Sequence, residues 1–270
     1  MKQPIGIFDS GVGGTSIWKE IRTLLPFENT IYLADSKNAP YGAKPQKEIL
    51  RLSIKNTELL LEKGCKLIVV ACNTATTNAI DYLRANYEVP FVGIEPAIKP
   101  AALQSKSKTV GVLATKGTLA SSLFHSTSEM YAQGIKIVEQ EGKGLVPLIE
   151  AGKVGSEETK ALLLDFLEPM LALGIDQLVL GCTHYPYLIP VLSELLPEHV
   201  RIIDSGEAVA RQTKAVLEKN RLLNTSDKSG SSAFYTNGDV AILNSFLKNR
   251  TSSSPLTFSI LSAELNSISL

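Results

Sequence analysis

The chain has 270 residues, of which 44% are hydrophobic, so it can bury a large core that divides into two lobes. Lysine plus arginine and aspartate plus glutamate number 27 each, and the resulting zero net charge gives no electrostatic footprint for nucleic acid or an anionic membrane. The start lacks the apolar core of a signal peptide, no run reaches the roughly 18 apolar residues of a membrane span, and three cysteines make no disulfide framework. We therefore expect a soluble, cytoplasmic protein with free thiols.

Short apolar runs alternate with amphipathic helical patterns in the first hundred residues. A continuous Val/Ile/Leu run is typical of a buried parallel strand, and the predicted strands are Ile5–Phe8, Ile31–Ala34, the run from Leu67 to Cys72, and Phe91–Ile94. Three helices are predicted in the same stretch. The first follows the glycine run at 11–14 and is stopped by Pro26, the second spans about Pro45–Lys63, and the third lies near Thr76–Asn86. The segment Ser36–Gly42 is irregular by composition.

The pattern then restarts at the end of this stretch. Three later runs repeat earlier ones at offsets between 105 and 110 positions: Val110–Thr115 after Ile5–Ser10, Gln177–Cys182 after Leu67–Cys72, and Arg201–Asp204 after Val92–Glu95. A repeat of more than 100 residues indicates two similar domains rather than a solenoid.

The last part of the chain is predicted to return to the first lobe. We expect a helix that runs to about Leu222 and then an exposed loop at Asn224–Ser232. Two edge strands, Phe234–Thr236 and Thr257–Ile260, are expected on either side of a helix at Val240–Lys248. The predicted class is α/β, with two similar doubly wound parallel-sheet domains related by internal duplication and the active site in the cleft between them. The first domain is residues 1–96 plus 207–270, and the second is 97–206.

The glycine run after the first strand resembles a dinucleotide-binding turn. Gly11 and Gly13 open a helix, and Asp35 ends the next strand at a suitable distance. Ser16 stands where that fingerprint has Gly or Ala, and Asp9 would place a negative charge beside a pyrophosphate. A small carboxylate at the helix amino terminus fits better than a nucleotide, and a plain tight turn is an equal alternative.

Two cysteines end equivalent strands of the two halves. Cys72 is followed by Asn73 and Thr74, and Cys182 by Thr183 and His184. Such polar groups are costly to bury without a ligand or partner, whereas a single strand-end cysteine is more often a small core residue. For Cys65 we accept that structural interpretation.

The polar neighbours of Cys182 also allow a zinc half-site. No second Cys/His cluster in the sequence completes four ligands, so we expect no metal. His184 is instead expected to support Cys182 or to hydrogen-bond a substrate, while His125 and His199 are assigned no role.

Two facing thiols without a metal suit proton transfer at carbon. Inversion of a stereocentre requires a base on one face and an acid on the other, and a thiol pKa near 8.5 allows both protonation states in a tuned site. Asp9 could relay charge to Cys72, and His184 to Cys182. Asn73, Thr74 and Thr183 could orient donors toward a carbanion next to a carboxylate.

Six motifs resemble those of the glutamate racemases, within the cofactor-independent aspartate/glutamate racemase superfamily. They are FDSGVGG (Phe8–Gly14), ADSKNAPYG (Ala34–Gly42), CNTAT (Cys72–Thr76), GCTHYP (Gly181–Pro186), DSGEA (Asp204–Ala208) and FYTNGD (Phe234–Asp239). The resemblance implies interconversion of L- and D-glutamate for peptidoglycan, without pyridoxal phosphate or another cofactor, by an enzyme that is usually a homodimer. Asn224–Ser232 and about the last twenty residues lack a counterpart.

The resemblance also implies roles for individual residues. Cys72 would handle D-glutamate and Cys182 L-glutamate, assisted by Asp9 and His184, with Glu150 as an additional acid near the second thiol. The substrate contacts implied are Asp9, Ser10, Tyr41, Gly42, Asn73, Thr74, Thr183 and His184, with Thr115 and Thr118 near the side-chain carboxylate.

Other functions remain open at this stage. Aspartate racemase and related two-cysteine racemases are the nearest alternatives, whereas an arylmalonate-decarboxylase-like enzyme would need only one thiol. A nucleotide-binding regulatory module could use the glycine turn and ignore both cysteines.

Overall fold

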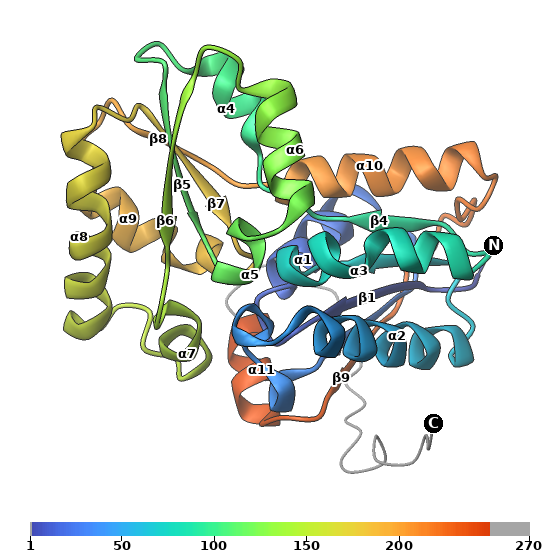
Figure 1. Cartoon of the computed structure of the whole chain (residues 1–270). Coiled ribbons are helices and arrows are strands. Elements are labelled where there is room, and N and C mark those ends of the chain that lie inside the picture. The colour runs from blue at the N-terminus through green and yellow to red at the C-terminus, as the bar shows by residue number, and fades with distance from the viewer. Residues whose placement is uncertain (1, 249–270) are drawn as a thin grey trace.

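The strands form two separate parallel sheets in the computed structural model, which describes residues 2–248 (Figure 1). The first sheet has the order β4-β3-β1-β2-β9, with strands β1 (Ile5–Asp9), β2 (Thr30–Ala34), β3 (Leu67–Val70), β4 (Phe91–Gly93) and β9 (Ser232–Thr236). The second sheet has the order β6-β5-β7-β8, with strands β5 (Thr109–Ala114), β6 (Lys136–Glu141), β7 (Gln177–Gly181) and β8 (Arg201–Ile203). The order β4-β3-β1-β2 is thus repeated as β8-β7-β5-β6, which confirms the predicted class of two similar doubly wound parallel sheets.

Helices connect the strands and cover the faces of both sheets (Figure 1). The α-helices are α1 (Thr15–Leu24), α2 (Gln46–Glu62), α3 (Asn73–Asn86), α4 (Ile98–Gln104), α5 (Lys116–Leu119), α6 (Ser122–Tyr131), α7 (Leu145–Glu150), α8 (Glu157–Ala172), α9 (Ile189–Leu195), α10 (Gly206–Lys219) and α11 (Val240–Lys248). Three short 3₁₀ turns are η1 (Ser36–Asn38), η2 (Tyr41–Ala43) and η3 (Tyr185–Leu188).

Alternation along each central strand sends side chains to opposite faces of the sheet. In β1, Ile5 and Ile7 pack with residues of α1, whereas Phe8 joins the cluster formed with α2 and α3. Every residue of β1, β3, β5 and β7 is buried, because parallel sheets with helices on both faces leave no wet side. The α1-side cluster extends into the second sheet through residues such as Leu178, so the two sheets share this part of the core.

The last described part of the chain lies against the first sheet. Strand β9 pairs with β2 in parallel register from Thr30↔Ser232 to Ala34↔Thr236, and α10 packs on α1. The edge strand at Phe234–Thr236 and the helix at Val240–Lys248 are therefore confirmed. The second expected edge strand, Thr257–Ile260, lies outside the described residues, and the domain boundaries at 96/97 and 206/207 stay a prediction.

Two helix bounds differ from the sequence prediction by three residues. Helix α3 begins at Asn73 rather than near Thr76, because Cys72 caps it: the Ala75 N–H donates to the Cys72 sulfur at 3.5 Å. Helix α10 ends at Lys219, three residues before the expected Leu222. The early start of α3 places Asn73 and Thr74 in its first turn, next to the thiol.

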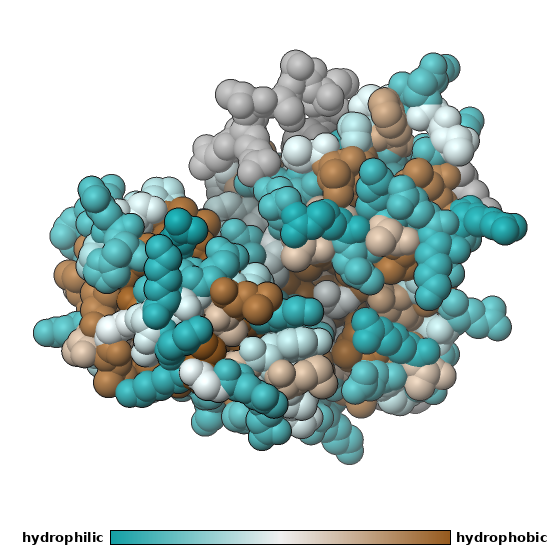
Figure 2. Space-filling model, turned by 90° about the horizontal axis from the view of Figure 1, so that it is seen from above, coloured by the Kyte–Doolittle hydropathy of each residue, from teal (hydrophilic) through white to brown (hydrophobic). Residues whose placement is uncertain are grey.

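The surface carries hydrophilic residues with smaller hydrophobic patches between them over the face that Figure 2 shows. Within residues 2–248, none of the helices combines the length and the apolar character that a bilayer crossing requires.

Candidate active site

One pocket brings both predicted cysteines together. Cys72 follows β3 and Cys182 follows β7, so each lies at the carboxyl end of a central strand, where open α/β sheets bind ligands. Ten predicted site residues line this inner pocket: Ser10, Tyr41, Gly42, Cys72, Asn73, Thr74, Thr115, Cys182, Thr183 and His184. The other three, Asp9, Glu150 and Thr118, do not line it but hydrogen-bond to residues that do.

The sulfur of Cys72 lies between a helix amino terminus and a hydroxyl. It accepts the Ala75 N–H, and it hydrogen-bonds to the Ser10 hydroxyl at 3.7 Å. Burial raises the pKa of the Cys72 thiol well above its usual range, and the Asp9 carboxylate acts in the same direction. Cys72 is therefore a neutral thiol, that is, a proton donor.

The sulfur of Cys182 lies against an imidazole that is itself paired with a carboxylate. His184 Nδ1 is 3.8 Å from the Cys182 sulfur, and His184 Nε2 is 2.6 Å from Glu150 Oε1. Burial disfavours the charge on His184, but the contacts with Cys182 and Glu150 outweigh it and raise the pKa of His184 well above its usual range. His184 is thus an imidazolium near neutral pH, and a thiolate forming at Cys182 would lie beside a positive charge.

Asp9 is fully buried beneath the glycine turn. Its Oδ2 accepts the N–H groups of Gly14 at 2.9 Å and Gly11 at 3.2 Å, and its Oδ1 accepts the Thr183 hydroxyl at 3.3 Å. Burial raises the pKa of Asp9 above its usual range, although the His184 charge and the two N–H groups act to lower it. The carboxylate thus connects the first strand to the polypeptide that follows Cys182.

The glycine turn binds two carboxylates of the protein itself. Gly11 and Gly14 donate to Asp9, and the Val12 N–H donates to Glu150 Oε1 at 2.8 Å. The sequence alone favours an external carboxylate over a nucleotide at this helix amino terminus, with a plain tight turn as an equal alternative. That expectation is wrong for these N–H groups, because side chains already occupy them.

Two glycines of this turn are required by the packing of His184 and Glu150. A Cβ at Gly13 would lie 2.3 Å from His184 Nδ1, and one at Gly11 would lie 2.0 Å from Glu150 Oε1. The glycines therefore permit close approach of the second lobe, and no signal in the sequence separates this role from phosphate binding.

Three threonine hydroxyls lie within hydrogen-bond distance of one another at the pocket wall. Thr74 is 2.8 Å from Thr115 and 3.4 Å from Thr118, and Thr115 is 3.1 Å from Thr118. Close to them, both polar atoms of the Asn73 side chain are buried without a hydrogen-bond partner in the described residues. A buried amide without partners is rare in folded proteins, so it marks a place for a polar ligand.

Tyr41 contributes its ring rather than its hydroxyl to the wall of the inner pocket. The hydroxyl donates to Asp35 Oδ2 at 2.5 Å and accepts from Asn56 at 3.0 Å. Asp35 therefore holds Tyr41, a residue of the pocket wall, and is not a ribose-binding acid. The sequence alone could not distinguish these two roles. Pro40 and Val146 also line the pocket and were not predicted.

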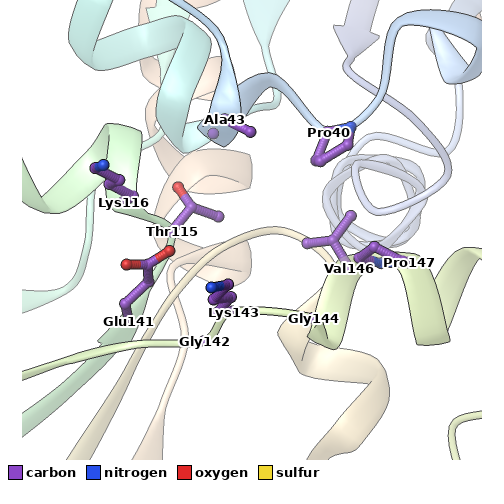
Figure 3. Close-up of a pocket in the computed structure, with 11 residues that line it drawn as sticks. Pro40, Ala43, Thr115, Lys116, Glu141, Gly142, Lys143, Gly144, Val146 and Pro147 are labelled. Carbon is purple, nitrogen blue, oxygen red and sulfur yellow. The ribbon is translucent and has the colours of Figure 1, made fainter.

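A larger cavity adjoins the inner pocket (Figure 3). Both are lined by Pro40, Gly42, Thr115 and Val146. Among residues 2–248, no three His, Cys, Asp or Glu side chains come together in an arrangement that could hold a metal ion.

The chain is similar to known proteins over most of its length. Residues 11–213 match the family described as Asp/Glu/Hydantoin racemase. A relative from Herpetosiphon aurantiacus named glutamate racemase is 48% identical over 239 residues, which cover 88% of this chain and 94% of the relative.

Two solved structures of glutamate racemases have a similar fold. Isoform RacE1 from Bacillus anthracis has a TM-score of 0.86 and 28% identity, covering 97% of this chain and 98% of its own. The Escherichia coli enzyme, solved with L-glutamate and the activator UDP-MurNAc-ala, has a TM-score of 0.83 and 34% identity, covering 96% and 97%.

Proposed function

The chain belongs to the Asp/Glu/hydantoin racemase family, and we propose that it interconverts L- and D-glutamate by proton transfer between two thiols, without a cofactor. The observation that carries this proposal is the pocket lined by Cys72 and Cys182, each at the carboxyl end of the equivalent strand of its sheet. The similarity to proteins named glutamate racemase supports the choice of glutamate.

The different surroundings of the two sulfurs support a direction for each thiol. With L-glutamate bound, Cys182 as thiolate removes the α-proton, and Cys72 as thiol delivers a proton to the opposite face of the planar carbanion. Cys182 then holds the proton and Cys72 the negative charge, which is the state that accepts D-glutamate. One proton enters the substrate and one leaves, so the reaction is balanced.

The polar neighbours serve these transfers in different ways. His184, held by Glu150, compensates the negative charge of Cys182, while Asp9 orients Thr183 and borders the Cys72 side. Asn73, whose amide has no partner in the described residues, and Thr74 are suited to the α-carboxylate and ammonium. The hydroxyls of Thr115 and Thr118 suit the side-chain carboxylate, and Ser10, Tyr41 and Gly42 complete the wall.

The wider setting is part of the same proposal. A D-glutamate-forming enzyme would supply peptidoglycan synthesis from the cytoplasm. A homodimer is also proposed, and exposed apolar side chains on α4 and α6, Leu103 at 77% exposure and Met130 at 65%, are suited to a contact between copies.

Circular dichroism of D-glutamate and D-aspartate incubated with the protein in heavy water tests the proposal. We expect the signal of D-glutamate to decay while that of D-aspartate persists, with deuterium appearing only in the newly formed enantiomer at early times. The protein is purified without added pyridoxal phosphate, and its visible absorbance is recorded. Decay with aspartate alone would assign a different substrate, and decay that depends on added cofactor would contradict the two-thiol chemistry.

A further inference from the structure

The cavity next to the inner pocket has a volume of about 350 Å³, enough for a small amino acid. Figure 3 shows its walls: Pro40 and Ala43 come from the first lobe, and Thr115, Lys116, Glu141 and Lys143 lie on the second-lobe side. Because Pro40, Gly42, Thr115 and Val146 line both cavities, the outer one adjoins the pocket that the two thiols line. We call the outer cavity the vestibule.

Three charged side chains line the vestibule. Lys116 is the first residue of α5, Glu141 is the last residue of β6, and Lys143 lies between Gly142 and Gly144 in the loop before α7. Lys116 and Lys143 are exposed, and within residues 2–248 none of the three has an ion-pair partner. The three side chains together thus carry a charge of +1, which no ion pair within residues 2–248 offsets.

This local charge matters because the chain as a whole has none. Its formal net charge is zero, so no overall field attracts an anion to the molecule. Fields from a few charges in a cleft can still raise the local concentration and the association rate of an oppositely charged ligand. An acidic amino acid carries two carboxylates and one ammonium, the complement of two lysines and one glutamate.

We propose that the vestibule is an entrance site for acidic amino acids, in which Lys116 and Lys143 bind the two carboxylates before the substrate passes to the thiols. This inference rests on the proposed function for the identity of the natural ligand. Glu141 faces the ammonium and keeps the local charge at +1, so the anion is attracted but not retained. Lys116 and Lys143 are therefore specificity-determining residues for access and take no part in proton transfer.

The entrance site is tested with two alkylating agents of similar size and different charge. Iodoacetate is an anion and iodoacetamide is neutral, and in both the cysteine sulfur displaces iodide to form a thioether. Alkylation of the Cys72 and Cys182 peptides is followed over time by mass spectrometry. The ratio of the two rate constants cancels the intrinsic reactivity of the thiol and reports the field along the access path.

The variant Lys116→Gln/Lys143→Gln is compared with wild type and with Lys219→Gln/Lys228→Gln, which removes the same charge from exposed positions at and beyond the end of α10. We expect the iodoacetate-to-iodoacetamide ratio to fall about fivefold in the vestibule variant at ~20 mM ionic strength. In 0.5 M salt the difference shrinks below about twofold, since the Debye length is then only a few ångströms. The distant variant keeps the wild-type ratio, and Lys116→Arg/Lys143→Arg restores it.

An unchanged ratio in the vestibule variant, or an equal fall in the distant variant, overturns the proposal. The alkylation ratio does not depend on which amino acid is the substrate. Failure of wild type to racemise glutamate would therefore contradict the proposed function and leave the entrance site to be judged by the alkylation ratio alone.

Discussion

The two thiols occupy equivalent places in two similar sheets, yet their surroundings differ. After β3 the chain enters α3 directly, with Cys72 as its cap, so that sulfur accepts a helix N–H and its thiol donates to the Ser10 hydroxyl. After β7 the chain forms the short turn η3 instead, and His184 lies against the Cys182 sulfur with Glu150 behind it. The repeated strand order preserved the position of each sulfur, and the connection that follows each strand determined its electrostatic environment.

This difference suits a reaction with a mirror-image substrate and product. A single resting state needs one thiol that holds its proton and one that can lose it. Burial keeps the proton on Cys72, whereas the Cys182 sulfur lies 3.8 Å from Nδ1 of the positively charged His184. Two identical half-sites would have left the order of the two transfers undefined.

Removal of either thiol is the strongest test of this comparison. We expect Cys72→Ala and Cys182→Ala each to lower racemisation at least ~1000-fold, because one face of the carbanion loses its acid or base. Cys72→Ala should still exchange the α-hydrogen of L-glutamate with heavy water, and Cys182→Ala that of D-glutamate, both without inversion. Deuterium incorporation by mass spectrometry and optical rotation measure the two properties.

The third cysteine is the matched control. Cys65 is buried beside Gly6 and does not line the pocket, so Cys65→Ala should racemise at close to the wild-type rate. If both active-site variants exchanged the same enantiomer, the assignment of one thiol to each face would be wrong.

Removal of the imidazolium should affect one half-site more than the other. In His184→Asn we expect the kcat from L- to D-glutamate to fall about 100-fold, and the reverse kcat to fall less, because only Cys182 loses its positive neighbour. The equilibrium constant of a racemisation is unity, so kcat/KM must fall equally in both directions. Initial rates from each enantiomer measure the asymmetry, and His199→Asn, at an exposed position, is the control.

A methyl group at Gly13 should disturb the same half-site by contact alone. The added Cβ would overlap His184 Nδ1, and His184 is buried with Glu150 behind it, so the imidazole must shift from Cys182. We expect Gly13→Ala to lower kcat about 10- to 100-fold, in the range that a 1 Å misplacement costs. Gly155→Ala, where a Cβ meets nothing within 4 Å, should be unaffected. A wild-type rate in Gly13→Ala would show that the position of His184 is not critical.

The smallest expected effect is on stability and depends on pH. The contacts with Cys182 and Glu150 overcome burial and raise the folded-state pKa of His184 above the unfolded value of about 6.5. The stabilisation by the protonated histidine is therefore fully present below about pH 6.5 and is lost as the pH rises through the raised folded-state pKa. Urea unfolding should show a deficit of about 1–3 kcal/mol for His184→Asn at pH 6 and a smaller one at pH 9.5.

The variant Glu150→Gln separates the contribution of the His184–Glu150 ion pair from the other contributions to this pH-dependent stability. With the carboxylate removed, the folded-state pKa of His184 falls, and the pH dependence of the His184→Asn deficit should weaken in the Glu150→Gln background. A deficit that is the same at both pH values in both backgrounds would contradict a charged His184.

The amino-acid sequence by itself determined the strands, their parallel class and the positions of the two thiols. Apolar runs such as Leu67–Val70 and Gln177–Gly181 are typical of strands buried on both faces in a covered parallel sheet, and a residue at the carboxyl end of such a strand lies at the ligand edge. Cys72, Cys182 and their polar neighbours were therefore visible as candidates. Glu150, Thr115 and Thr118 came only from the resemblance to a family, since their own spacing carries no signal.

Only the tertiary structure decided which partners these residues have. The N–H groups of the glycine turn bind Asp9 and Glu150 rather than an external anion, and the Tyr41 hydroxyl turns to Asp35. Val12 and Glu150 are 138 positions apart in the chain. Contacts over such separations depend on how two sheets pack against each other, and local sequence patterns specify the period of a strand or helix but not that packing.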